Sequence, residues 1–378
     1  MIVIKILVFL LGVLLVVYTG FSAVRTFVLP RSARDRVTGA VFTYMRKIFN
    51  LIIKRFSSYH YRDQVMGYYV PIALFTLQIT WLLLLGIGFA AMYWALGMES
   101  LHDVVMLSGS SLLTLGFAVP PGNQYLAITF FEAIIGLIQL ALLISYLPTL
   151  YSAFSRRESA VSMLEVRAGS PPSAVVMIQR FNRLNRLEKL QDLWEDWEMW
   201  FVDIEETHTS LPMLAFYRSP QSAHSWVTAA GAVLDAASLY LSTIDGPRIV
   251  EGDLCLRAGY LSLRRIADYF QIEYDTEFLP DNRENARFVS ITRDEFDTAY
   301  DELAASGVPL KPDREQAWYD FAGWRVNYDT VLLALAGMVM APIAPWSSDR
   351  SPNRILRKGN RRNINALSSP KPQDKVAK

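Results

Sequence analysis

The residues best suited to chemistry lie in one short stretch, Ser108 to Ala118, which reads Ser-Gly-Ser-Ser-Leu-Leu-Thr-Leu-Gly-Phe-Ala. The stretch lies between two long apolar runs, 69–96 and 125–151. A short amphiphilic helix, a Thr-x-Gly-aromatic turn and a following span together are typical of a re-entrant pore loop. Backbone carbonyls in such a turn can replace the hydration shell of an ion. Irregular backbone at that depth is tolerated only where it is buried in protein or lines a cavity. The alternative is an ordinary extracellular loop.

These residues resemble the pore of the tetrameric potassium-channel family. Residues 114–117, Thr-Leu-Gly-Phe, are similar to that family's Thr-Val-Gly-Tyr filter. The resemblance covers about residues 69–155 and includes the order of the parts, which is span, pore helix, filter, span. Two positions depart from the family: its second filter glycine is Ala118 here, and the acid that usually follows is Val119. Because only glycine takes positive φ freely, Ala118 argues against strict potassium selectivity.

The resemblance implies a selectivity filter in this loop, with hydroxyl oxygens added by its threonine at the inner end. It also implies a homotetramer, since one loop per chain cannot enclose an ion path. The conducted species would be a monovalent cation, with potassium as the expected ion, and no cofactor is expected. The filter residues so assigned are Thr114, Leu115, Gly116, Phe117 and Ala118.

Three residues are expected to support this loop. Ser110 and Ser111 belong to the predicted pore helix, 101–113, and Glu132 is the one ionisable residue inside a predicted span. Because a carboxyl group in lipid is costly, Glu132 is expected to face protein, water or the rear of the filter. We expect it to brace the loop through hydrogen bonds to the backbone, to Ser110 or to Ser111. The alternative places Glu132 near the lipid headgroups.

Two residues of the third span, Gly136 and Pro148, are candidate gating bends. This span resembles the family's inner, pore-lining helix, and Gly136 lies about where that family often carries a gating glycine. Glycine weakens a helix by roughly 1 kcal/mol relative to alanine, and proline is a common cause of kinks. A small residue in a membrane helix also allows close packing against a neighbour, which is the alternative interpretation of Gly136.

Three uncharged runs are long enough to cross a bilayer core of about 30 Å: 6–24, 69–96 and 125–151. A cleaved signal peptide is the rival interpretation of the first run. The basic segment 31–66 follows it, and the positive-inside rule places that segment in the cytoplasm. We therefore expect a multi-pass protein of the cell membrane with its N-terminus outside and its C-terminal domain in the cytoplasm.

The basic segment is predicted to be an amphipathic helix on the cytoplasmic surface, with its apolar stripe in the acyl boundary and anionic lipid as its partner. The alternative is a solvated linker helix that packs on the C-terminal domain. The apolar residues at helical spacing are Val37, Val41, Tyr44, Met45, Ile48, Ile52 and Phe56.

Residues 156–346 change character, because charges return and helical periodicity dominates. No glycine-rich turn follows a strand pattern, which argues against the nucleotide-binding regulatory domain common in potassium channels. Within this domain, 331–346 is uncharged but too short to span comfortably, so we expect a buried or interfacial helix there. The domain resembles no family, and an unknown cytoplasmic ligand or protein is its possible partner.

Several classes of function are disfavoured. The single cysteine, Cys255, excludes an intrachain disulfide and a cysteine-based zinc cluster. Glu205 and His208 form one Glu-x-x-His element, whereas di-iron bundles need two, and His224 has no acid three residues before it. We expect no metal site, no enzyme activity and no nucleic-acid partner, since neither a nucleophile–base set nor a basic-aromatic pattern is present.

The sequence thus predicts an all-α membrane protein with three transmembrane helices, one re-entrant pore loop and an all-α cytoplasmic domain. The expected function is a potassium-channel-like cation pore gated by that domain. The alternative is a non-conducting, pore-like membrane anchor that carries a signalling or interaction domain. The expected domains are a first transmembrane helix (1–30), a basic amphipathic linker (31–66), a pore unit (67–155), a helical domain (156–346) and a disordered basic tail (347–378).

Overall fold

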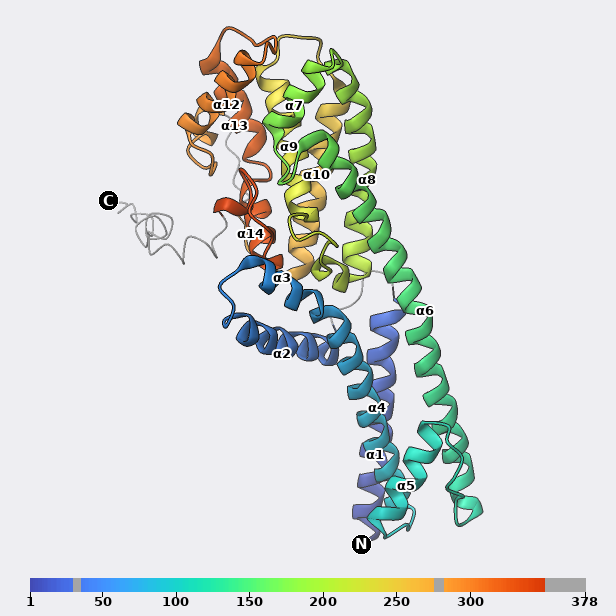
Figure 1. The fold of residues 1–378 in the computed structure, drawn as a ribbon. Helices are drawn as coiled ribbons and strands as arrows, with labels where there is room; N and C mark the ends of the chain where they lie inside the picture. The colour runs from blue at the N-terminus through green and yellow to red at the C-terminus, as the bar shows by residue number, and fades with distance from the viewer. Residues whose placement is uncertain (30–34, 275–281, 351–378) are drawn as a thin grey trace, which may run out of the picture. The chain divides into compact units, whose positions relative to one another are not determined.

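The computed structural model describes residues 1–29, 35–274 and 282–350 (Figure 1). Over these ranges the regular secondary structure is helical, and one isolated antiparallel bridge joins Ile244 to Leu310. The predicted all-α class is therefore confirmed, with three long apolar helices that could span a membrane and further helices C-terminal to them.

The described residues form two compact units, and each is treated by itself. A short segment from the C-terminal half of the chain belongs to the first unit. The first unit comprises Met1–Arg156 with Glu206–Arg218, and the second comprises Arg157–Glu205 with the described residues from Ser219 onward.

The three long apolar helices make the chain a multi-pass membrane protein. They are α1 (Ile2–Phe27), α4 (Tyr69–Ala95) and α6 (Asn123–Ala168). The first and third predicted runs lie inside α1 and α6, and the second matches α4 as far as its C-cap, Leu96. At about 1.5 Å per residue the 46 residues of α6 exceed a bilayer core of about 30 Å, so only part of α6 can lie in hydrocarbon.

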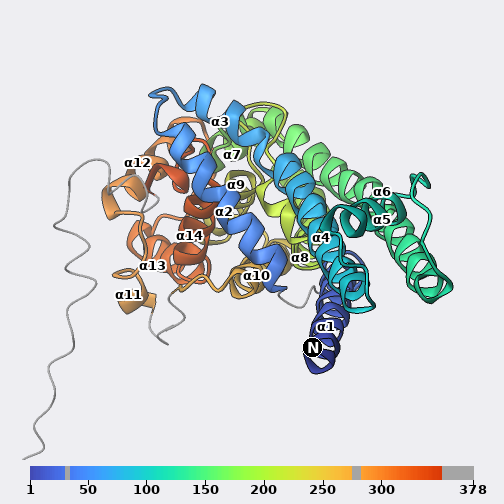
Figure 2. The same cartoon turned by 90° about the horizontal axis from the view of Figure 1, so that it is seen from below.

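Helices α1 and α4 lie side by side and pack closely (Figures 1 and 2). A Cβ atom added to Gly12 would lie 2.6 Å from the carbonyl oxygen of Gly88, and one added to Gly88 would lie 2.7 Å from Cγ2 of Val16. Small residues allow this approach, as is common between membrane helices. The indole of Trp81, which is fully buried, donates a hydrogen bond of 2.9 Å to Ser22 Oγ. The first helix is thus an integral part of this unit.

The predicted basic amphipathic helix is present as α2 (Arg36–Ile53), which is followed by α3 (Tyr59–Gly67). Helix α2 has two apolar faces, whereas the sequence pattern identified one. Phe42 and Phe49, outside the predicted stripe, are buried and form edge-to-face ring contacts with Tyr69 at the start of α4. The second face therefore packs against protein.

The side chain of Asp35 caps α2 and connects it to α1. Its Oδ2 accepts hydrogen bonds from the amide of Thr38 at 2.8 Å and from the hydroxyl of Ser22 at 2.6 Å. A capping acid satisfies an amide that has no partner within the helix.

We expect Asp35→Ala to lower the free energy of unfolding of the chain in detergent by about 1–2 kcal/mol, because it removes a helix cap and an acceptor together. Hydrogen exchange at the first amides of α2 should become faster. Thr43→Ala, on the exposed side of the same helix, is the control and should leave both quantities unchanged. Equal behaviour of the two variants would contradict this role of Asp35.

The second unit is built around α9 (Trp226–Thr243), in which every residue except Leu241 is buried. Helices that contact α9 include α7, α10, α13 and α14, which surround it in Figure 1. The remaining helices of the C-terminal half are α7 (Ala174–Arg183), α8 (Leu190–Ser210), α10 (Val250–Phe270), α11 (Asn282–Asn285), α12 (Arg293–Ala305), α13 (Arg314–Arg325) and α14 (Asp329–Val339), with short 3-10 turns η1 (Leu187–Lys189), η2 (Pro212–Phe216) and η3 (Ser348–Arg350).

A buried arginine organises the core of the second unit. Arg325 is fully buried; its Nε lies 2.6 Å from Asp329 Oδ1, and its Nη1 is bonded to Asp235. Burial lowers the pKa of Arg325, but the two carboxylates outweigh this effect and raise it above its usual value. Because Arg325 also donates to the carbonyl oxygen of Trp346, α9, α13, α14 and this later segment are held together.

The C-terminal part of this unit extends beyond the predicted boundary. The uncharged stretch 331–346, predicted as a buried or interfacial helix, is helical only up to Val339, in α14, where Leu332 and Leu335 are fully buried. The predicted disordered tail starts at 347, yet Ser348 is buried and Arg350 pairs with Glu295 at 2.8 Å. These contacts hold the first residues of that tail against the unit. Most of the predicted tail, 351–378, lies outside the described residues.

Candidate functional site

The predicted pore helix is present as α5 (Leu101–Leu112), between α4 and α6 (Figure 1). It begins at Ser100, whose hydroxyl accepts from the amide of Asp103. Its Val104 and Leu107 are buried in an apolar cluster that also contains Phe89 of α4. The segment between the two spans is therefore a packed helix with a turn, in the order that the sequence predicted.

The chain leaves α5 through a strained turn. Thr114 has φ of +56° and Gly116 has φ of +71°. Positive φ is open to glycine but is an outlier for a β-branched residue such as threonine. Residues held in such conformations cost about 1–3 kcal/mol each and cluster at functional sites. The strain at Thr114 therefore marks this turn as a candidate site.

The carbonyl oxygens of residues 114–117 accept no hydrogen bond from any residue that the structure describes. The hydroxyl of Thr114 donates instead to the preceding carbonyl, that of Leu113, at 2.8 Å. These four residues are exposed in a single chain, where water can hydrogen-bond to their carbonyls. Consecutive carbonyls that face solvent are also available to bind a cation.

The side chains of this turn are uncovered in a single chain. Leu115 is 60% exposed and Phe117 is 57% exposed. Thr114 and Gly116 are exposed as well, and Ala118 is partly buried. Large apolar side chains grouped at one exposed place indicate a surface that another molecule covers.

Ser110 is hydrogen-bonded to the turn through both its backbone and its side chain. Its carbonyl oxygen accepts hydrogen bonds from the amides of Leu115 at 2.8 Å and Gly116 at 3.3 Å. Its hydroxyl, which is buried, accepts from the amide of Ala118 at 3.0 Å. Ser110 thus bonds three residues of the predicted filter, while the amide of Thr114 donates to the carbonyl oxygen of Ser111 at 3.0 Å. Ser111 is also buried, and its hydroxyl donates within α5 to the carbonyl of Leu107 at 2.9 Å.

Glu132 is fully buried in protein, but its partners differ from the expected ones. Its carboxyl oxygens accept hydrogen bonds from Ser108 at 2.5 Å and from Tyr93 at 2.7 Å, rather than from Ser110 or Ser111. Successive residues of a helix are turned by about 100°, so Ser108 and Ser110 face different sides of α5. Glu132 therefore joins α6 to both α4 and α5.

Sequence reasoning missed the roles of Tyr93 and Ser108. Tyr93 lies near the end of α4, where an aromatic residue is usually assigned to the membrane interface, yet its side chain is fully buried. Glu132 was the signal in the sequence that could have pointed to these partners, because a buried carboxyl group needs hydrogen-bond donors nearby.

Gly136 is the point at which α6 meets the end of the pore helix. A Cβ atom added here would lie 2.0 Å from the carbonyl oxygen of Leu112 and 2.9 Å from its carbonyl carbon. This contact supports the packing interpretation of Gly136. Pro148, the other predicted bend, lies inside α6 and is exposed. The helix runs through both positions, and their gating role stays a prediction.

Other residues weighed in the sequence have ordinary surroundings. Cys255 is a buried free thiol, as expected. His208 is fully buried beside Thr207, and Nε2 of His224 lies 3.3 Å from Glu165. Within the described residues, no group of three or more His, Cys, Asp or Glu side chains is placed to hold a metal ion.

No known protein family, curated protein or solved structure matches this chain. The class that the fold defines is a multi-pass, all-helical membrane protein with further helices C-terminal to its three candidate spans.

Proposed function

We propose that this chain is one subunit of a homotetrameric cation channel that resembles the potassium-channel pore family. The unpartnered carbonyls of residues 114–117 are the observation that carries the proposal. Oxygen atoms of this kind, repeated around an axis, replace water around an ion that loses its hydration shell. Ser110 and the buried Glu132 would keep them in place. The mechanism is passive conduction, without a catalysed reaction.

Exposed apolar residues support assembly into an oligomer. Leu115 and Phe117 of the turn would meet neighbouring subunits near the axis. Helix α6 exposes Phe130, Ile134 and Leu137, each by more than half. In the proposed tetramer, neighbouring copies and lipid cover these side chains.

The charge pattern supports the orientation of the pore. Residues 97–124 contain Glu99 and Asp103 but neither lysine nor arginine, whereas the segment around α2 is rich in both. By the positive-inside rule the turn after α5 belongs to the outer half of the membrane, and α2 and the C-terminal helices lie in the cytoplasm. The negative end of the α5 dipole would then favour a cation in the pore.

Gating by the C-terminal half is supported by the segment Glu206–Arg218, which packs within the first unit. Arg218 lies 3.3 Å from Asp63 of α3. The guanidinium of Arg46 on α2 lies 5.5 Å from the ring centre of Tyr69 and 5.6 Å from that of Phe216. A ligand or protein that moves this segment would act on the helices that lead into α4.

The test is cation flux into liposomes that contain the purified full chain. We expect potassium uptake in the wild type and a clear loss of uptake in Gly116→Val, because a β-branched residue does not readily adopt the φ of this position. Thr114→Ala should change the relative permeability of potassium and sodium. Leu101→Ala, at an exposed position at the start of α5, is the control. Flux that is unchanged in both filter variants would overturn the proposal.

A non-conducting membrane anchor is the second candidate, and Ala118 favours it. Ala118 does not take positive φ, whereas the family's glycine at this place allows that conformation. Its amide is bonded to Ser110 instead. Silent bilayer recordings, together with tight binding of a soluble partner by the C-terminal helices, would favour this candidate over the channel.

A further inference from the structure

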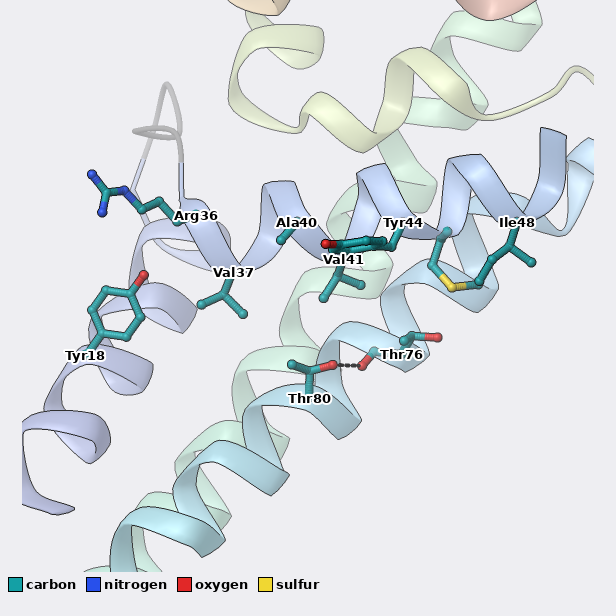
Figure 3. Close-up of a pocket in the computed structure, with 10 residues that line it drawn as sticks. Tyr18, Arg36, Val37, Ala40, Val41, Tyr44, Ile48, Thr76 and Thr80 are labelled. Atoms are coloured by element: carbon teal, nitrogen blue, oxygen red, sulfur yellow. Dashed lines mark hydrogen bonds between the residues drawn. The ribbon is translucent and has the colours of Figure 1, made fainter. Parts of the chain in front are cut away.

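A cavity of about 540 Å³, broadly open to the surface, lies in the first unit between α2 and the two spans α1 and α4 (Figure 3). Val37, Val41 and Ile48 project into it from α2. They belong to the apolar stripe predicted from the sequence, and Ile48 is 50% exposed. The opposite face of α2 packs on protein, so this stripe is the face that remains uncovered in the described structure.

The wall formed by α4 is also apolar in character. Thr76 and Thr80 line the cavity, but each hydroxyl is already satisfied within its own helix. Thr76 donates to the carbonyl of Ile72 at 2.8 Å, and Thr80 donates to that of Thr76 at 2.7 Å. These threonines therefore leave no unsatisfied donor to attract water into the cavity.

One end of the cavity is polar and positively charged. Arg36 begins α2, is exposed and forms no ion pair with a residue that the structure describes. The hydroxyl of Tyr18 on α1 lies on the same side of the cavity (Figure 3). A guanidinium binds phosphate oxygens through parallel hydrogen bonds, and a tyrosine hydroxyl can add another.

We propose that this cavity is a binding site for an anionic phospholipid. One acyl chain lies along Val37, Val41 and Ile48, and the headgroup phosphate binds at Arg36 and Tyr18. The lipid is the occupant indicated because two of the three walls are candidate membrane spans and because Arg36, the one cation among the described residues that line the cavity, is at one end. The lipid site is independent of the proposed channel function, because lipid binding requires no conduction.

The experiment uses the full chain in a mild detergent with photoreactive phosphatidylglycerol or phosphatidylcholine, each carrying a diazirine in its acyl chain. Labelled peptides are mapped and quantified by mass spectrometry. We expect the label on peptides that contain residues 36–48 and 76–80. Phosphatidylglycerol should label them about fivefold more than phosphatidylcholine, the effect of one cation beside an anionic headgroup.

Two pairs of variants separate the headgroup from the acyl chain. Arg36→Gln should abolish the preference for phosphatidylglycerol, whereas Lys54→Gln, an exposed cation at the C-cap of α2 outside the cavity, should keep it. Val41→Trp should fill the cavity and lower labelling by both lipids severalfold. Leu51→Trp places the same ring on an exposed position of α2 outside the cavity and should leave labelling unchanged.

Equal labelling by the two lipids in the wild type would overturn the proposal. So would label spread evenly over α1 and α4, or the same behaviour of Arg36→Gln and Lys54→Gln. If Val41→Trp fails to fold, the comparison of Arg36→Gln with Lys54→Gln still tests the proposal, because Arg36 is exposed and its substitution leaves the core unchanged. A channel that conducts normally without this lipid would leave the proposed function intact, and a silent protein that binds the lipid would leave this inference intact.

Discussion

Gly136→Ala is expected to abolish cation flux and to destabilise the chain by at least about 3 kcal/mol, the upper end of the usual cost of overpacking. The new Cβ would lie 2.0 Å from the carbonyl oxygen of Leu112. That oxygen belongs to the backbone, so no rotation of a side chain can relieve the overlap. Either α6 or the end of α5 must move, and Ser110 moves with α5. Flux into liposomes and thermal unfolding in detergent measure the two effects.

The same substitution separates the two interpretations of Gly136. If this glycine were mainly a hinge, alanine would stiffen α6, change the open probability and add about 1 kcal/mol of helix stability. If it is a packing contact, alanine lowers stability and flux together. Gly20→Ala in α1 is the matched control, because a Cβ added there meets no heavy atom within 4 Å. A Gly136→Ala protein with wild-type stability would refute the packing interpretation.

Glu132→Ala is expected to lower the free energy of unfolding by about 2–4 kcal/mol, because each buried donor left without an acceptor costs about 1–3 kcal/mol. The donors are the hydroxyls of Tyr93 and Ser108. Each has a second, longer contact, to Thr129 at 3.2 Å and to the carbonyl of Gly86 at 3.4 Å, which limits the loss. Flux should fall as well, since α5 loses its connection to α6.

A double-mutant cycle tests whether this connection has the proposed partners. Ser108→Ala should cost little in a chain that already carries Glu132→Ala, because the shared hydrogen bond is gone. Glu132→Gln keeps the shape and one acceptor oxygen, so it should fall between the wild type and Glu132→Ala. Glu99→Ala, which removes an exposed acid, is the control. Additive losses from Ser108→Ala and Glu132→Ala would contradict a direct interaction.

The elements of the N-terminal half could be predicted from the sequence because they depend on local patterns. The long uncharged runs 6–24, 69–96 and 125–151 predicted α1, α4 and α6, since length and hydropathy decide what can cross a bilayer. The Thr-x-Gly-Phe turn after 101–113 predicted a short helix followed by irregular backbone. Helical spacing predicted the apolar stripe of α2. The filter, tetramer and gating assignments remain predictions.

Only the tertiary structure decided which side chains meet. The sequence showed Glu132 as the one ionisable residue of a predicted span but could not name Tyr93 and Ser108, which are 39 and 24 residues away from it. The contact between Gly136 and Leu112, which favours the packing interpretation, likewise appears only in the structure. The second apolar face of α2, with Phe42 and Phe49, became visible only against Tyr69. The physical reason is common to all of these: spacing along a helix gives the direction of a side chain, whereas its partner depends on how separate helices approach one another.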